Sequence, residues 1–219
     1  MEPDAVNPPA SSAAKSIQSV LDRWGLTIDD LTKIVDANPS LRGMMLGYAA
    51  EYVLRRRHFT DARLTGIVKD DDHDRERKGD LRFEYRGRSF RIECKSLQSN
   101  SIKTLGEGNF KGTYQCDASD RRPVTFDDGT TIETTCLLVG EFDIVAVNLF
   151  GFTDEWRFAF ALNKDLPRSR FRKYTEYQRE RLLSTSMKIT WPIAWPYVLD
   201  PFPLLDLVVD GQISLPKPV

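Results

Sequence analysis

The chain has 219 residues, of which 41% are hydrophobic and 29% are charged, with a formal net charge of −1. These values are ordinary for a globular domain, and they exclude a protein that attracts nucleic acid through a large overall positive charge. Two histidines and three separated cysteines argue against zinc and multi-histidine metal centres, and they predict reduced thiols in the cytoplasm. No apolar run reaches the ~20 residues of a membrane-spanning helix and no signal peptide is recognised, so we expect no membrane association.

The amino-terminal part predicts an arm followed by helices. Residues 1–14 are rich in Pro, Ala and Ser and predict a flexible arm, whereas residues 15–219 predict a single domain. Helical spacing of apolar residues predicts one helix over about 16–24 and a second that starts near Thr27 or Asp29. These first helices carry no obvious chemical group.

A third helix is predicted from Pro39 to about His58, because Pro is favoured at the first helical position. It has a predicted buried stripe made of Leu41, Met44, Met45, Tyr48, Tyr52 and Val53. Glu51 lies at the edge of this stripe. It either pairs with Arg55 one turn later or supplies an acidic group to a functional site.

Residues 79–98 (GDLRFEYRGRSFRIECKSLQ) predict two short strands joined by a tight turn. Asp80 stands at the mouth of this hairpin, and Glu93 and Lys95 lie near the end of its second strand. Side chains alternate along a strand, so Glu93 and Lys95 share one face while Cys94 points to the other, towards the core. Two carboxylates and an ammonium would therefore converge. For Glu93 and Lys95 alone, a cross-strand ion pair remains the alternative.

Further along, Asp128-Gly129 predicts a hairpin with a type I′ turn. The apolar run 142–150 predicts a central strand covered on both faces, and the alternating residues 156–162 are expected to pair with it. A basic helix is predicted over about 169–187, and the tail from Trp191 predicts an ordered wrapping segment.

Five basic side chains are candidate DNA contacts. They precede the predicted 128–129 hairpin or belong to the predicted basic helix, and they are Arg121, Arg122, Arg170, Arg172 and Lys173. Such residues contact phosphates in many DNA-binding proteins, but they are equally common as solvated surface charges. The sequence leaves both interpretations open.

The hairpin residues suit hydrolysis of a phosphodiester by a metal-activated water. Asp80 and Glu93 offer the oxygen ligands that Mg²⁺ prefers, and the Cys94 main-chain carbonyl offers another. Lys95 would orient or deprotonate the attacking water, or stabilise the transition state. Because a bound metal lowers the pKa of water towards roughly 7, no histidine base is required.

These residues resemble the PD-(D/E)XK nuclease superfamily, in which an Asp opens a hairpin and Glu-X-Lys lies on the next strand. Asp80 and Glu93-Cys94-Lys95 match that pattern, and Gly79 stands where the family name has Pro. The resemblance implies that Glu51, on the preceding helix, is a further catalytic acid and metal ligand. It also implies an α/β fold with a mixed α+β sheet: a restriction-endonuclease-like core of order αβββαβ over about 39–165, an N-terminal helical extension and a C-terminal helical or irregular wrap.

The function implied by this resemblance is Mg²⁺-dependent endonuclease activity, with Mn²⁺ as a substitute metal. The chain is most similar to bacterial type II restriction endonucleases, which act on double-stranded DNA in the cytoplasm, and a homodimer is expected because cleavage of both strands needs two active sites. Two alternatives remain: a DNA repair or junction-resolving nuclease, and a non-catalytic DNA-binding module that keeps the fold.

Overall fold

The computed structural model describes residues 18–69 and 79–216, and the chain forms two compact units with the boundary between Arg42 and Gly43. The flexible arm predicted for residues 1–14 lies outside the described residues. The first unit contains α1 (Val20–Trp24) and α2 (Ile28–Ala37). Both begin with a capping box, formed by Ser19 with Asp22 and by Thr27 with Asp30. Because Ser19 is the extended N-cap, α1 begins later than the predicted residue 16.

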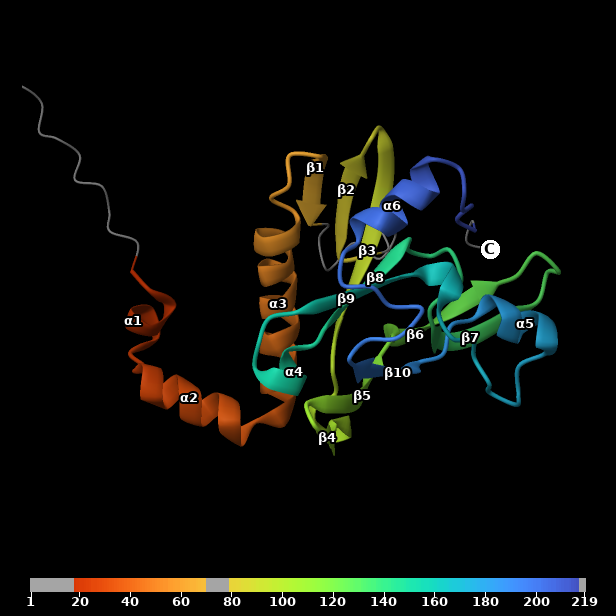
Figure 1. The fold of residues 1–219 in the computed structure, drawn as a ribbon. Coiled ribbons are helices and arrows are strands. Elements are labelled where there is room, and N and C mark those ends of the chain that lie inside the picture. The colour runs from red at the N-terminus through yellow and green to blue at the C-terminus, as the bar shows by residue number, and fades with distance from the viewer. Residues whose placement is uncertain (1–17, 70–78, 217–219) are drawn as a thin grey trace, which may run out of the picture. The chain divides into compact units, whose positions relative to one another are not determined.

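The second unit is built on a five-stranded mixed sheet with strand order β1-β2-β3-β8-β9 (Figure 1). The strands are β1 (Leu64–Lys69), β2 (Leu81–Tyr85), β3 (Arg88–Ser96), β8 (Ile144–Asn148) and β9 (Phe158–Leu162). Neighbouring strands are antiparallel, except that β3 and β8 are parallel. The prediction of a mixed α/β architecture is therefore confirmed at the level of fold class.

The predicted hairpin at 79–98 corresponds to β2 and β3. Arg86 and Gly87 both have positive φ angles, 48° and 76°, as a two-residue type I′ turn requires. The buried residues alternate along both strands, and Phe83 pairs with Phe90 across them. The local pattern therefore predicted this element correctly.

The apolar run at 142–150 forms the interior strand β8, in which all five residues are buried. Ile144 and Ala146 belong to the core on one face of the sheet, whereas Val145 and Val147 belong to the core on the other. Strand β9 pairs with β8 in antiparallel fashion. The predicted central strand and its partner are confirmed.

Two helices contribute to the core on one face of this sheet, α3 (Pro39–His58) and α6 (Phe202–Val209). The bounds predicted for α3 are correct, but of its predicted stripe only Val53 packs against this core. Ala50 and Leu54 are the buried residues of this fully described helix. The large apolar side chains of its first half are exposed, namely Met44, Met45, Tyr48 and Tyr52. The packed contacts of α3 come from its carboxyl-terminal half, which spacing alone does not reveal.

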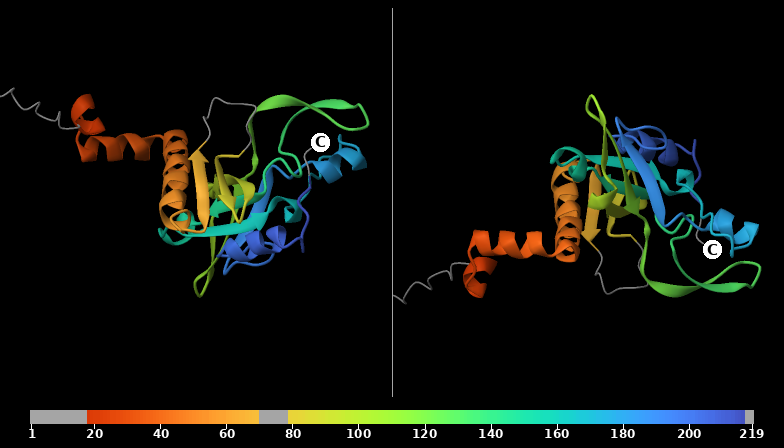
Figure 2. Two further views of the ribbon diagram at one scale, coloured as in Figure 1. Left: turned by 90° about the horizontal axis from the view of Figure 1, so that it is seen from above. Right: turned by 90° about the horizontal axis from the view of Figure 1, so that it is seen from below.

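On the opposite face lies a second sheet of order β10-β5-β4, whose strands β5 and β10 share a core with that face, whereas the hairpin β6–β7 packs in a separate small core (Figure 2). Their bounds are β4 (Lys103–Gly106), β5 (Asn109–Gln115), β6 (Asp117–Thr125), β7 (Thr131–Cys136) and β10 (Ser186–Trp191). Tyr114 of β5 and Met187 of β10 pack with Val145 and Val147 in one core. The remaining elements are short: η1 (Ser99–Ser101), α4 (Phe150–Thr153), η2 (Asn163–Asp165) and α5 (Glu176–Arg181).

Three details of the prediction are wrong. The helix expected between the third and fourth core strands is absent from residues 97–143, all of which are described and which contain η1 and β4 to β7. The turn at Asp128-Gly129 is not type I′, because a five-residue loop joins Thr125 to Thr131 and only Gly129 within it has a positive φ. The basic helix shrinks to α5, because Thr175 caps its start and residues 186–191 form β10.

No helix among the described residues is long and apolar enough to cross a membrane.

Candidate functional site

The mouth of the β2–β3 hairpin holds Asp80 in a fixed position. The Asp80 amide donates a hydrogen bond to the Ile92 carbonyl at 2.8 Å, and the Cys94 amide donates one to the Asp80 carboxylate at 2.6 Å. A strand residue directs its N–H and C=O to the same edge, so the Cys94 carbonyl also points towards the edge that Asp80 occupies. These contacts place the carboxylate beside the middle of β3.

Gly79 explains why a proline is absent before Asp80. Its φ angle is 94°, whereas the pyrrolidine ring fixes proline near −65°. A Cβ atom at this position would lie 3.2 Å from the Ile92 carbonyl oxygen and 3.3 Å from Cβ of Arg91. Glycine is therefore required by both the backbone conformation and the close approach of β3.

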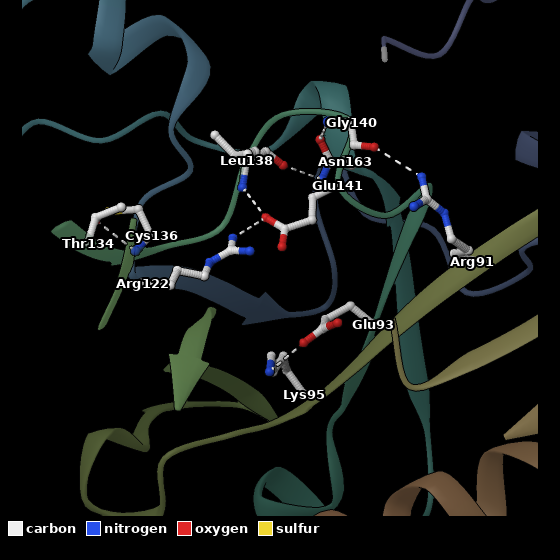
Figure 3. Close-up of polar contacts among 10 residues, drawn as sticks. All are labelled: Arg91, Glu93, Lys95, Arg122, Thr134, Cys136, Leu138, Gly140, Glu141 and Asn163. Atoms are coloured by element: carbon white, nitrogen blue, oxygen red, sulfur yellow. Dashed lines mark hydrogen bonds and ion pairs between the residues drawn. The ribbon is translucent and has the colours of Figure 1, made fainter. Parts of the chain in front are cut away.

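Glu93 and Lys95 lie together on one face of β3, as predicted, opposite Val145 and Val147 of β8 (Figure 3). The Lys95 ammonium lies 2.7 Å from the Glu93 carboxylate. The side chain of Glu93 is 12% exposed and that of Lys95 is 22% exposed. The pair is therefore largely shielded from water but still accessible from solvent. Cys94, between them, packs against the core on the helical face.

The charges of this group act strongly on one another. Burial, followed by the negative charge of Glu93, raises the pKa of Asp80 from 3.8 to about 8. Burial disfavours the charged form of Lys95, but the carboxylates of Glu93 and Asp80 outweigh it and raise the pKa of this lysine above its ordinary value. Lys95 is therefore an ammonium at neutral pH. Asp80 loses its proton less readily than an ordinary aspartate, because the positive charge of Lys95 does not offset burial and the charge of Glu93.

Glu51 lies on α3 and is not paired with Arg55, the partner considered from the sequence. Its carboxylate lies 2.7 Å from the ammonium of Lys69 on β1. Its negative charge contributes to the raised pKa of Asp80, as the smallest of the causes. Glu51 is thus near enough to affect the charge of Asp80, although its own carboxylate is paired with Lys69.

The donor chemistry of this group fits a hard divalent cation. Asp80, Glu93 and the Cys94 carbonyl offer oxygen ligands, and the raised pKa of Asp80 marks a buried place where added positive charge would be stabilising. Among the described residues, no three His, Cys, Asp or Glu side chains form a metal-binding group. Any cation would therefore be completed by water, by the main chain and by substrate oxygens, as is usual for Mg²⁺.

Arg122, one of the predicted DNA contacts, points into the protein. Its guanidinium lies 2.5 Å from the carboxylate of Glu141, which is 4% exposed (Figure 3). The same carboxylate oxygen accepts a hydrogen bond from the Leu138 amide at 2.7 Å. This contact gives Arg122 a structural partner, and its contact with DNA stays a prediction.

The other predicted DNA contacts divide into two groups. Arg121 and Arg170 line one cavity, although they are far apart in the sequence. Arg172 and Lys173 lie in the segment before α5, where Arg172 is exposed and Lys173 is also at the surface. Sequence reasoning grouped these residues by charge, whereas the structure groups Arg121 with Arg170.

Glu141 was missed by sequence reasoning. It lies in the stretch 137–147 (LLVGEFDIVAV), which is apolar except for Glu141 and Asp143, and one of its oxygens is buried without a hydrogen-bond partner among the described residues. A carboxylate inside an apolar run predicts a buried ion pair, because a solvated position would not need such neighbours. The position of Glu141 in this run is therefore a sequence signal for the ion pair.

Comparison with protein-family models, with curated proteins and with solved structures found no match to this chain.

Proposed function

We propose that this protein is a Mg²⁺-dependent DNA endonuclease whose active site contains Asp80, Glu93 and Lys95. The observation that supports the proposal is that Asp80, held beside β3, lies close enough to Glu93 and Lys95 for their charges to act on its pKa. The 2.6 Å hydrogen bond from Cys94 fixes the first of them, and the 2.7 Å ion pair joins the other two. An isolated cross-strand ion pair needs neither the buried Asp80 nor the raised pKa that accompanies it.

Each residue has a proposed role that follows from its chemical group. Asp80, Glu93 and the Cys94 carbonyl would hold Mg²⁺ or Mn²⁺, with Glu51 as a more distant acid. A bound metal would supply an activated water and would neutralise the charge that builds on the phosphoryl group. Lys95, whose ammonium lies 2.7 Å from Glu93, would orient or deprotonate that water or stabilise the developing charge.

The finer fold is also part of the proposal. A helix, a three-stranded antiparallel meander and a parallel fourth strand (α3, β1–β3 and β8) follow the order of the restriction-endonuclease-like core. The strands β4 to β7 take the place of its second helix. On this basis we infer a restriction or defence nuclease of the cytoplasm that acts as a homodimer on double-stranded DNA, since two strands require two sites.

The test is incubation of the purified protein with supercoiled plasmid and with four-way-junction DNA, in Mg²⁺, in Mn²⁺ and in excess EDTA. We expect linear plasmid fragments with discrete ends in Mg²⁺ and none in EDTA. Cuts confined to the branch point would instead assign a junction-resolving nuclease. Binding without cleavage in either metal would identify a non-catalytic DNA-binding module and refute the proposal.

A further inference from the structure

A cavity of about 400 Å³ opens between the β6–β7 hairpin and the segment before α5. Residues from β6 and β7, from the segment 169–174 and from positions 184–185 line it, and those used below are Arg121, Glu133, Thr135, Arg170, Phe171 and Tyr174. None of Asp80, Glu93 and Lys95 is among its described lining residues. It is therefore a different site from the candidate metal site.

Strand geometry directs one arginine of β6 inward and its neighbour to the cavity. Successive side chains of a strand point to opposite faces. Arg122 binds the buried Glu141, and Arg121 lines the cavity. The fold thus separates two consecutive arginines, one for a buried ion pair and one for the cavity wall.

The cavity wall is suited to an anion. The guanidiniums of Arg121 and Arg170 form no ion pair with any described residue, and both residues are exposed. Glu133 is the single carboxylate among the described lining residues, so positive charge predominates there. Arginine presents several N–H donors in a planar fork that matches phosphate oxygens. The hydroxyl of Thr135, which has no hydrogen bond within the described protein, adds another donor.

The same wall carries an aromatic surface. Phe171 is 52% exposed, although it is a large apolar side chain. The ring of Tyr174 packs edge-on against it at 5.0 Å, and the Tyr174 hydroxyl is itself held by Thr134 at 2.8 Å. A supported aromatic ring that stays half exposed beside two arginines is the arrangement on which nucleobases stack.

We propose that this cavity binds one phosphorylated nucleotide of the DNA substrate, held outside the base stack, with its base on Phe171 and its phosphate on Arg121 and Arg170. Its volume lies near the lower end of ligand sites, about 300–1,000 Å³, and so suits one nucleotide rather than a base pair. The inference rests on the proposed function for the identity of the substrate. It adds that the enzyme recognises an unpaired or extruded nucleotide.

The test measures binding without cleavage, in EDTA, with the full-length Lys95→Ala protein. Two probes are compared: a duplex that carries one unpaired nucleotide with a 5′-phosphate, and a blunt duplex of the same length. We expect Phe171→Ala to weaken binding of the first probe about five- to a hundredfold, as loss of one stacked base does, and to change binding of the second less than about twofold. Phe171→Trp should restore binding, and Trp195→Ala, which alters an 82% exposed aromatic outside the cavity, should have no effect.

Three results would overturn the inference: no loss with Phe171→Ala, an equal loss with both duplexes, or displacement of the probe by free dAMP as readily as by the oligonucleotide. The second result would show that the cavity contacts only the DNA backbone. The third would show that its ligand is a free nucleotide. Plasmid cleavage by the wild type is measured separately. A Phe171-dependent probe preference without any cleavage would refute the nuclease and leave the nucleotide pocket standing.

Discussion

The Cys94 amide donates a 2.6 Å hydrogen bond to the carboxylate of Asp80, so the first acid of the candidate site is fixed to the backbone between the other two residues of that site. The geometry depends on β2 and β3 being paired at this end, where Asp80 also donates to Ile92. A site built on two paired strands is rigid, which metal-dependent catalysis requires.

Asp80→Asn should stabilise the protein while abolishing cleavage. The pKa of Asp80 is raised from 3.8 to about 8, so between these values the folded state binds a proton that the unfolded state does not. Stability therefore falls as pH rises through this window, and removing the charge recovers it. At pH 8 without metal, we expect an increase of at least about 1 kcal/mol, or roughly 2–4 °C in Tm. The prediction is contradicted if the Tm gain of the variant over the wild type is smaller at pH 8 than at pH 5.

Metal binding should depend on the same carboxylates. Mg²⁺ or Mn²⁺ should give a measurable heat by titration calorimetry with the wild type, and Asp80→Asn or Glu93→Gln should reduce the affinity at least about tenfold, because each removes a hard oxygen ligand and a negative charge. Glu133→Gln, which removes an exposed carboxylate elsewhere, is the matched control and should bind metal normally. Equal affinities in all four proteins would rule out this site.

Arg122→Ala should destabilise the fold rather than weaken DNA binding selectively. It would leave the 4% exposed Glu141 without its cationic partner, and an uncompensated buried charge costs about 3–5 kcal/mol. Urea unfolding measures this loss. Arg121→Ala, at the adjacent residue, should change stability by less than about 0.5 kcal/mol. Adding Glu141→Gln to Arg122→Ala should recover part of the loss, and a failure of Arg122→Ala to destabilise would show that the pair is not structural.

The exposed arginines before α5 should contribute to the salt dependence of DNA binding. Each lost phosphate contact lowers the slope of log K against log salt by about 1, so Arg170→Ala with Arg172→Ala should lower it by about 2. Arg23→Ala, at an exposed arginine of α1, serves as the control. An unchanged slope in the double variant would identify this segment as an ordinary solvated surface.

Local sequence signals predicted the elements that depend on local geometry. Arg86-Gly87 specified its turn, and the continuous apolar run specified β8, because both are determined by a few adjacent residues. Strand alternation likewise predicted that Glu93 and Lys95 share one face of β3, whereas Asp80, which precedes β2, is held by the Cys94 amide. The assignment of these three residues to a functional site stays a prediction.

The errors have both local and tertiary causes. Phe171, Tyr174 and Tyr177 have helical spacing, but the helix starts only at the capping box of Thr175 and Gln178. Met187 and Ile189 alternate as strand residues because β10 pairs with β5. Likewise, the cavity that unites Arg121 with Arg170 depends on contacts between distant segments, which no local pattern reports.

The most direct test of the proposed active site is the rate of plasmid cleavage in Mg²⁺ by the wild type, by Lys95→Ala and by Lys188→Ala, an exposed lysine of β10. Each protein is first shown to be folded by circular dichroism. Loss of an electrostatic group that acts on the transition state costs about 10²–10³ in rate, so we expect at least that loss for Lys95→Ala and wild-type cleavage for Lys188→Ala. Cleavage at the wild-type rate by folded Lys95→Ala would contradict the assignment of the active site.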